Sequence, residues 1–443
     1  MRGHDSTSLA SFVREHRNLN RHSQAIASIR EKLDGNGGEA TGEIVNGPSQ
    51  EAYENRALPN SYITYDQSIG ASKAYEQVKS HGRATGNKFW RLIGPTTGSV
   101  PDLTTYTGRS TVASGRITSL AIAPACAPGD CRLWVGAAGG GVWRTDNALD
   151  SSPKWTPSSD GIASNAIGSL FVDPTDPKGK TLYAGTGEPN GSSDSEAGVG
   201  LYKSTDGGKS WSLVPGSVAA AKDRSIGAIA VDPTNSQHIY IGTAVARHGS
   251  SSVNGGRFTP PDAPTVGLYE STDGGASFKL VFSQPADSVN PASPTGSDFF
   301  RGGVSKIVFD PTSATSRIYF SMFDYGLYRT AANGSYERVF ASAGGGSVGN
   351  SAGSRTEFAL APHDGKLRIY LGDTSGVQAD FYRVDDAGVP AATLTTGAAN
   401  PGWTKLSNSA NGSLATPRTT TARRSARTTC SSPRRPANRA TCG

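Results

Sequence analysis

Arginine residues recur at one kind of position, shortly before apolar runs that have the composition of β-strands. Four of them precede such a run by one to three residues: Arg116, Arg224, Arg301 and Arg355. A guanidinium group can form two parallel hydrogen bonds with a carboxylate or a sulfate, so this spacing is suited to binding an anion. The same side chains could instead bond to carbonyl groups of their own loops, and the sequence leaves both roles open.

Three long loops between predicted strands supply further acidic, basic and aromatic groups. They are Gly187–Gly200, Ala244–Gly267 and Pro285–Gly303. Their candidate ligand-binding residues are Glu188, Asp194 and Glu196 in the first loop, Arg247, His248 and Arg257 in the second, and Asp298, Phe299 and Phe300 in the third. Guanidinium groups suit anions and aromatic rings suit sugar rings, so these loops favour a binding surface.

The sequence lacks the residue sets that most kinds of catalysis require. The sequence contains no Ser/His/Asp set, no phosphate-binding loop and no cluster of Cys and His, so we expect no cofactor and no metal. Gly139–Gly141 is interpreted as a tight turn between strands because no helix follows it. Glu188 is a candidate catalytic acid, but it follows Gly-Thr-Gly in a loop, where a structural hydrogen-bonding role fits equally well. The other catalytic residues, if any, are unknown.

The formal net charge of +6 does not indicate nucleic-acid binding. Residues 418–443 contain seven arginines and no lysine or acid. Without these arginines the rest of the chain is close to neutral, so it lacks the basic surface that nucleic acid requires.

Five apolar strands of similar sequence position the loops. Each ends at a proline, and successive prolines are 50, 59, 78 and 51 residues apart. Three further strand-like segments follow most of them, and the last often opens on an aromatic residue. Four short strands repeated at this period predict an all-β fold, a β-propeller of four-stranded blades, with five blades visible. The first strands are ITSLAIAP at 117–124, IGSLFVDP at 167–174, IGAIAVDP at 226–233, VSKIVFDP at 304–311 and EFALAP at 357–362.

One turn sequence occurs twice: GLYKSTDGGKSW at 200–211 returns as GLYESTDGGASF at 267–278. Its aspartate can accept hydrogen bonds from backbone N–H groups, and its glycines can adopt backbone angles that side chains disfavour. We interpret it as a structural staple of a β-hairpin. Its residues are Ser204, Asp206, Gly208, Ser210 and Trp211 in the first copy, and Ser271, Asp273, Gly275, Ser277 and Phe278 in the second.

At these residues the chain resembles the Asp-box (BNR-repeat) propellers, and among them bacterial sortilin-like or glycosyl hydrolase-like repeat proteins. The resemblance covers roughly residues 90–409 and also rests on WVGAAGGGVWRT at 134–145 and YAGTGEPNGSS at 183–193. It implies that ligands bind on the face formed by the loops before the first strands and after the second strands. The Asp-box turns would lie on the opposite rim.

The resemblance implies three possible functions, because the group contains binding proteins and enzymes. We expect an extracytoplasmic propeller that binds a glycan or a peptide. The alternatives are a glycoside hydrolase, sialidase-like or xyloglucanase-like, and a structural or assembly propeller with no small ligand. The Phe/Tyr-Arg-Ile-Pro motif of sialidases is absent. The catalytic Thr-Asp-Ile-Gly-Gly of xyloglucanase-type enzymes is matched by Ala137–Gly141, with Ala138 in place of the acid. Both departures count against those particular activities.

The chain divides into three parts. Residues 1–88 form a helical or extended lead-in, with helices predicted at Ser8–Leu33 and Asp66–His81 from the apolar spacing. Residues 89–412 form the blades, and residues 413–443 a disordered basic tail. The composition of the tail matches out-of-frame reading of a GC-rich gene, so we interpret it as a frameshift product, with a natural disordered tail as the alternative. The propeller would then be truncated, and an open arc of five blades would expose a sheet edge.

Cys126 and Cys131 flank a tight turn, APGD, between two predicted strands. A disulfide across this hairpin is the prediction, with two reduced thiols as the alternative. A disulfide favours an oxidising compartment, hence a secreted or cell-envelope protein, although the N-terminus lacks the apolar core of a signal peptide. No apolar run is long enough to span a membrane, and we expect a monomer.

Overall fold

The structure is a computed structural model, and it describes residues 57–58, 63–81, 98–100, 111–113, 115–189, 196–246, 248, 262–283, 302–342, 355–375 and 378–407. The predicted helix Ser8–Leu33 and the basic tail 413–443 lie outside the described residues.

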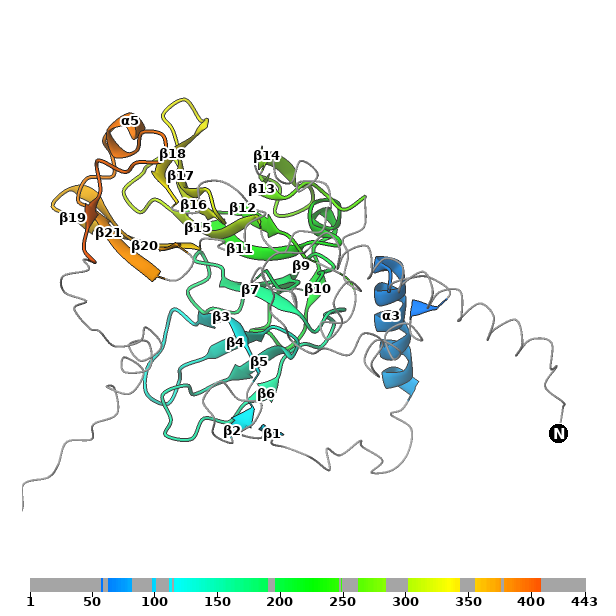
Figure 1. Cartoon of the computed structure of the whole chain (residues 1–443). Helices are drawn as coiled ribbons and strands as arrows, with labels where there is room; N and C mark the ends of the chain where they lie inside the picture. The colour runs from blue at the N-terminus through cyan, green and yellow to red at the C-terminus, as the bar shows by residue number, and fades with distance from the viewer. Residues whose placement is uncertain are drawn as a thin grey trace, which may run out of the picture.

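Five four-stranded antiparallel sheets dominate the described part of the chain, and each is built from four consecutive strands (Figure 1). This architecture confirms the prediction of an all-β fold, a β-propeller of four-stranded blades. Blade 1 contains β3 (Ile117–Ile122), β4 (Leu133–Ala137), β5 (Gly141–Thr145) and β6 (Thr156–Pro157). Blade 2 contains β7 (Ile167–Val172), β8 (Leu182–Thr186), β9 (Leu201–Ser204) and β10 (Ser212–Leu213). Blade 3 contains β11 (Ser225–Asp232), β12 (Asn235–Ala244), β13 (Gly267–Ser271) and β14 (Lys279–Ser283). Blade 4 contains β15 (Val304–Phe309), β16 (Ile318–Met322), β17 (Gly326–Thr330) and β18 (Tyr336–Ala341). Blade 5 contains β19 (Thr356–His363), β20 (Lys366–Ser375), β21 (Gln378–Val384) and β22 (Thr404–Lys405).

The other described elements are short, apart from one helix. That helix, α3 (Tyr65–His81), matches the range predicted from the sequence. Thr64 and Gln67 cap its first turn reciprocally, since each side chain accepts a hydrogen bond from the backbone N–H of the other. No described helix is long and apolar enough to cross a membrane. The remaining elements are β1 (Gly98–Val100) paired with β2 (Thr111–Ala113), η2 (Pro215–Ser217), α4 (Val218–Ala221) and α5 (Ala391–Leu394).

Consecutive blades pack through their first two strands. The second strand of blades 1, 2 and 3 carries a glycine that faces an isoleucine or a valine at the start of the next blade's first strand. A Cβ on that glycine would overlap the neighbouring side chain, so the blades approach to a distance that only glycine permits. The pairs are Gly136 with Ile167 at 2.8 Å, Gly185 with Ile226 at 2.6 Å, and Gly242 with Val304 at 2.5 Å from the added Cβ.

The hydrophobic core is divided among the blade interfaces. Four apolar clusters are present among the described residues, and each is shared by two consecutive blades. Between blades 1 and 2, for example, Trp134 of β4 packs with Ile167 and Leu170 of β7. Because blades 2, 3 and 4 bury both of their faces against neighbours, their stability comes mainly from interfaces with other blades.

The repeated turn joins the third and fourth strands of blades 2 and 3. In the first copy Asp206 Oδ1 accepts hydrogen bonds from the backbone N–H groups of Lys209 and Ser210, at 2.8 and 3.0 Å. Ser210 Oγ donates to Asp206 Oδ2 at 2.6 Å, and Gly208 N donates to Ser204 Oγ at 2.9 Å. In the second copy Asp273 accepts from the N–H and the hydroxyl of Ser277 in the same way.

The first copy of the turn also contacts the preceding blade. Trp134 Nε1 donates to the carbonyl oxygen of Gly207 at 3.0 Å, and a Cβ on Gly208 would lie 2.8 Å from the same indole nitrogen. Trp211 Nε1 donates to the carbonyl oxygen of Ser158 at 2.6 Å. The turn of blade 2 is thus fastened to blade 1.

Cys126 and Cys131 form a disulfide in the hairpin between β3 and β4, and their Cα atoms are 4.1 Å apart. This spacing falls within the reach of the bond that the sequence predicts. The bridge closes a small loop at the rim of blade 1.

We expect Asp206→Ala to lower the free energy of unfolding by about 1–2 kcal/mol, because two turn N–H groups lose their acceptor. Chemical denaturation of the wild type and the variant measures this difference. Lys209→Ala, in the same turn, removes an exposed side chain and serves as the control, with little expected change. Equal effects of the two substitutions would contradict the staple role of the aspartate.

The pKa of Asp206 gives the same turn a dependence on pH. Burial alone raises this pKa, but hydrogen bonds from Ser210, Ser204 and Lys209 outweigh it and lower the value from 3.8 to about 2. A depressed folded-state pKa contributes stability above the unfolded pKa of about 4, and this contribution disappears as the pH falls towards about 2. The melting temperature of the wild type should therefore exceed that of Asp206→Asn by a constant margin above about pH 5. That margin should shrink between about pH 4 and pH 2, and a margin independent of pH would refute the assignment.

Candidate functional site

The loops before the first strands and after the second strands lie on one face, here called the loop face. Within a blade, residues at the start of the first strand pair with the end of the second, as Ile117 pairs with Ala137. The starts of neighbouring first strands lie together, because Ser169 Oγ near the start of β7 donates to the carbonyl oxygen of Ile226 near the start of β11, at 2.8 Å. The Asp-containing turns lie at the opposite end of the strands.

Arg116 and Glu188 connect blades 1 and 2 on the loop face. Arg116 Nη2 lies 3.1 Å from Glu188 Oε2, and the carboxylate is fully buried whereas the guanidinium group is partly exposed. The backbone N–H of Glu188 donates to the carbonyl oxygen of Glu196 at 2.8 Å, which closes the loop between β8 and β9. Of the two roles that the sequence left open for Glu188, this geometry supports the structural one, because a catalytic acid must reach its substrate.

The side chain of Arg224 also bonds to a neighbouring loop of the chain. Its side chain is fully buried, and Nε donates to the carbonyl oxygen of Pro264 at 2.6 Å. Burial lowers the pKa of Arg224 to about 10, which still leaves the group charged at neutral pH. The contact joins the loop before β11 to the segment that leads into β13. This buried arginine therefore stabilises the packing of the two segments under the loop face.

Arg355 lies at the start of blade 5, exposed, with its guanidinium carbon 5.3 Å from the centre of the Phe323 ring. The arginines in the described residues therefore have different surroundings: an ion pair at Arg116, a buried carbonyl contact at Arg224 and an aromatic ring at Arg355. The other sequence-based candidates lie outside the described residues: Arg301, Asp194, Arg247, Arg257, Asp298, Phe299 and Phe300.

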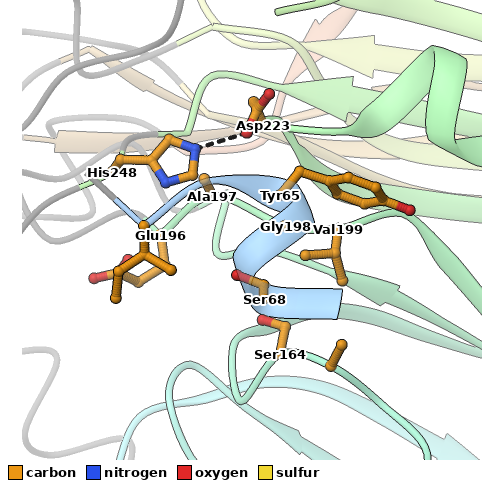
Figure 2. A pocket seen from close by; sticks show the side chains of 11 residues that line it. Tyr65, Ser68, Ser164, Glu196, Ala197, Gly198, Val199, Asp223 and His248 are labelled. Atoms are coloured by element: carbon orange, nitrogen blue, oxygen red, sulfur yellow. Dashed lines mark hydrogen bonds and ion pairs between the residues drawn. The ribbon is translucent and has the colours of Figure 1, made fainter. Parts of the chain in front are cut away.

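A pocket of about 140 Å³ opens on the loop face between blades 2 and 3, beneath α3 (Figure 2). Glu196 and His248, both candidates from the sequence, contribute to its lining. Such a volume holds on the order of five to ten water molecules, so it can take a single sugar-sized group. The polar residues that line it are Tyr65, Ser68, Ser164, Glu196, Asp223 and His248.

A buried carboxylate and an imidazole form one wall of the pocket. His248 Nε2 lies 2.8 Å from Asp223 Oδ1, and both side chains are largely buried. Asp223 has a positive φ of 60°, which Asp tolerates better than most residues. Its N–H donates to the carbonyl oxygen of Gly198 at 3.1 Å, and Gly198 N donates to the carbonyl oxygen of Arg224 at 2.8 Å. These bonds hold the two loops together and fix the aspartate towards the histidine.

The helix α3 covers the other side of the pocket with Tyr65 and Ser68. Lys79 near its C-terminal end donates to Asp160 Oδ2 at 2.8 Å, in the loop that precedes blade 2. The pocket thus combines groups from the lead-in and from two blades. Its carboxylates, imidazole and hydroxyls can donate and accept hydrogen bonds, as a sugar hydroxyl requires.

Several pocket residues were not selected from the sequence. Asp223 directly precedes Arg224, so its place before a first strand was a usable signal. Ser164 likewise lies three residues before Ile167. Tyr65 and Ser68 carry no such signal, because the sequence predicts their helix but not the surface on which it packs.

We expect Glu188→Gln to lower the free energy of unfolding by about 1–3 kcal/mol, because Arg116 loses a buried anionic partner. Glu357→Gln is the matched control, since Glu357 is an exposed partner of Lys306 at 3.2 Å. Breaking an exposed pair of this kind should cost less than about 1 kcal/mol. Thermal melts of both variants give the comparison, and similar shifts would exclude a structural ion pair at Glu188.

No protein-family model matches the chain. Two curated proteins are similar to it in sequence, both named xyloglucanase. The protein from Hypocrea jecorina (strain QM6a) is 32% identical over 209 residues, covering 42% of this chain and 21% of that protein. The protein from Paenibacillus sp is 28% identical over 294 residues, covering 60% of this chain and 24% of that protein. The chain therefore spans less than a quarter of the length of these relatives.

Solved structures that align with the chain include two GH74 enzymes. An ancestral GH74 enzyme covers 72% of this chain and 33% of its own, at 19% identity and a TM-score of 0.44. The GH74 xyloglucanase from Xanthomonas campestris covers 66% and 38%, at 19% identity and a TM-score of 0.41. The assignment of the fold rests instead on the strand order and the blade contacts described above. In sequence, the chain is similar to carbohydrate-active repeat proteins of the glycosyl hydrolase kind.

Proposed function

We propose that this chain is a glycoside-hydrolase-like β-propeller whose loop face recognises a polysaccharide of the xyloglucan class. The observation that carries the proposal is the sequence similarity of its blades to two xyloglucanases. A peptide ligand, which the sequence left open, has no comparable support. Because the chain spans only part of those relatives, their activity is not transferred to it whole.

The pocket between blades 2 and 3 is the proposed contact point for one sugar unit or branch. It combines the carboxylate of Glu196, the Asp223–His248 pair and the hydroxyls of Ser68 and Ser164. Sugar hydroxyls act as both donors and acceptors, so a pocket with both kinds of group can orient a ring.

Hydrolysis of the bound polysaccharide is the second candidate function. A glycosidase needs two carboxyl groups on either side of the scissile bond, and Glu196 and Asp223 both line the pocket. Ala138 stands where the resembling xyloglucanases carry a catalytic acid, in a turn whose N–H donates to the carbonyl oxygen of Arg116 at 3.0 Å. Catalysis through that position is therefore disfavoured, and binding without turnover is the primary proposal.

The hydrogen bonds of the two repeated turns bear on the narrower family assignment. Both copies of the turn share one set of Ser–Asp hydrogen bonds, which supports an Asp-box (BNR-repeat) propeller of the sortilin-like or glycosyl hydrolase-like kind. The disulfide between Cys126 and Cys131 supports a secreted or cell-envelope location, because such bonds persist in oxidising compartments.

The test exposes the purified chain to soluble xyloglucan, with carboxymethylcellulose and an unrelated α-glucan as comparison polymers. Affinity electrophoresis measures binding, and release of reducing ends measures hydrolysis. Retardation by xyloglucan alone supports the main proposal, and release of reducing ends supports the hydrolase. If neither retardation nor release of reducing ends occurred, both the binding and the hydrolase proposals would be rejected. The structural or assembly propeller would then remain.

We expect His248→Ala and Asp223→Asn each to weaken the binding of xyloglucan oligosaccharides by about 1–2 kcal/mol, since each removes one hydrogen-bonding group from the pocket wall. Asn keeps the shape of Asp and also tolerates a positive φ, so the second variant should fold normally. His363→Ala is the control, because this partly exposed histidine lies at the end of β19, away from the loop face. Isothermal titration calorimetry measures the three affinities. Equal affinities for His248→Ala, Asp223→Asn and His363→Ala would show that the sugar does not bind in this pocket.

A further inference from the structure

A histidine is held between two carboxylates where blade 3 meets blade 4. His238 lies on β12, and its Nε2 is 2.8 Å from Glu270 Oε1 on β13, whereas its Nδ1 is 3.2 Å from Asp232 Oδ2 at the end of β11. The side chains of His238 and Asp232 are 15% and 3% exposed. An ionised carboxylate only accepts hydrogen bonds, so the ring keeps both contacts only when each of its nitrogens carries a proton. The arrangement therefore requires a charged imidazole.

Blade 4 covers this cluster from one side. Phe309 of β15 lies edge-on to the imidazole ring, with 5.9 Å between the ring centres. Ser316, in the turn between β15 and β16, lies within hydrogen-bonding reach of Asp232. The hydroxyls of Tyr240 on β12 and Tyr336 on β18 are hydrogen-bonded to each other. The charged cluster is thus part of the contact between the two blades.

The other four described blades have different side chains at the two positions that hold Glu270 and His238. Glu270 faces Tyr240 across the sheet. The residues that face the corresponding aromatic ring in blades 1, 2, 4 and 5 are all cations: Arg144, Lys203, Arg329 and Arg383. His238 precedes Tyr240 by two residues, and the other blades have at this position Arg132, Thr181, Arg317 and Arg368. Arg and Lys stay charged up to about pH 10, whereas His titrates near neutral pH. Of these positions, only the one in blade 3 can therefore change its charge near neutral pH.

The protonation of His238 is governed by the groups around it. The charged or titratable side chains of the cluster are Asp232 from β11, Tyr240 from β12, Glu270 from β13, Lys279 from β14 and Tyr336 from β18. The hydrogen bond to Glu270 outweighs burial and raises the pKa of His238 above its usual 6.5. The bond from His238 in turn lowers the pKa of Glu270. Burial raises the pKa of Asp232, but its hydrogen bonds outweigh this effect and bring the value to about 2. Both carboxylates are therefore ionised where the imidazole titrates.

We propose that His238 is a pH-sensitive clamp between blades 3 and 4, closed while its imidazole is charged and loosened when the imidazole loses its proton. A neutral imidazole has a single N–H, so deprotonation leaves either Asp232 or Glu270 facing a nitrogen that cannot donate. A largely buried carboxylate that loses its partner is destabilising. Because Phe309 and Ser316 of blade 4 pack on this cluster, the loss weakens the contact between the two blades.

The raised pKa fixes the direction of the effect. Since the folded-state pKa of His238 exceeds the unfolded value of about 6.5, the stabilisation is fully present below about pH 6.5. It is lost as the pH rises through the folded-state pKa. The two carboxylates act in the opposite sense, because their lowered pKa values stabilise the fold above about pH 4. The clamp is therefore strongest in mildly acidic solution, between about pH 5 and pH 6.5.

Chemical denaturation of the wild type and His238→Gln over a series of pH values provides the first test. We expect the variant to have the larger unfolding constant in mildly acidic solution. The ratio of the two constants should fall above about pH 6.5, by at most about tenfold for each pH unit, because one proton is involved. His363→Gln is the matched control, since His363 is 43% exposed and its partner Asp364 is 84% exposed, so its ratio should stay flat. A ratio for His238→Gln that did not vary with pH would overturn the proposal.

Proton NMR of the imidazole resonances measures the titration of His238 in the wild type directly. The resonance is identified by its absence in His238→Gln, or by its change in Glu270→Gln should the first variant not fold. We expect a midpoint above 6.5 in the wild type and a lower one in Glu270→Gln, because the ring loses an anionic partner. A wild-type midpoint at or below about 6.5 would contradict the clamp.

Hydrogen exchange of the backbone amides shows where the structure loosens. Exchange is compared on either side of the measured midpoint, after correction for the pH dependence of the intrinsic rate. We expect the wild type to lose protection in β11, β12, β15 and β16 as His238 is deprotonated, and blade 2 to keep its protection at β7 and β8. His238→Gln should show no such difference between the two pH values. An equal loss of protection in blades 2 and 4 of the wild type would exclude a clamp located at this junction.

Discussion

The close approach of neighbouring blades is the constraint on which the rest of the structure depends. Glycine in the second strand lets the first strand of the next blade lie against the backbone, at Gly136, Gly185 and Gly242. Buried apolar side chains then fill the space on either side of this contact. A side chain at any of these glycines would force the blades apart, so packing, hydrogen bonding and loop position all follow from this spacing.

The loop face inherits its rigidity from the same contact. Gly187 adopts a positive φ of 87°, and a Cβ there would lie 2.6 Å from the Cα of Ser225 in the next blade. The loop after β8 is thereby pressed against blade 3, and Arg116, Glu188 and Arg224 bind its edges through an ion pair and a carbonyl contact. Some of the charged groups that the sequence offers as ligand-binding candidates thus join neighbouring loops. The pocket at Asp223 and His248 lies within this fixed frame.

The sequence predicts the fold well because the fold is periodic. Four strands of alternating or continuous apolar character recur five times, and the turn chemistry of Asp206 and Asp273 depends on local residues only. The ligand-site prediction was less complete for a physical reason. A guanidinium group before a strand has the same sequence signature whether it faces solvent, as Arg355 does, or lies buried against a carbonyl, as Arg224 does. Burial depends on the packing of the neighbouring blade, which no local pattern encodes. For the same reason Tyr65 and Ser68 of α3 could not be assigned to the pocket.

The strand order separates the parts of the molecule that must stay constant from those that can vary. A chain that passes up and down through four strands places the turn between strands three and four at one end, and the loop between strands two and three at the other. The first end carries the Ser–Asp hydrogen bonds and the indole contacts that fasten blade to blade. The second end carries the long loops, and their length can change without altering a blade interface. The loops after β8 and β12 are the longest of this kind in the predicted blades, and they flank the pocket at Glu196 and His248. A binding surface on this face can therefore take on new specificity while the interfaces beneath it remain the same, which explains how one architecture serves both binding proteins and enzymes.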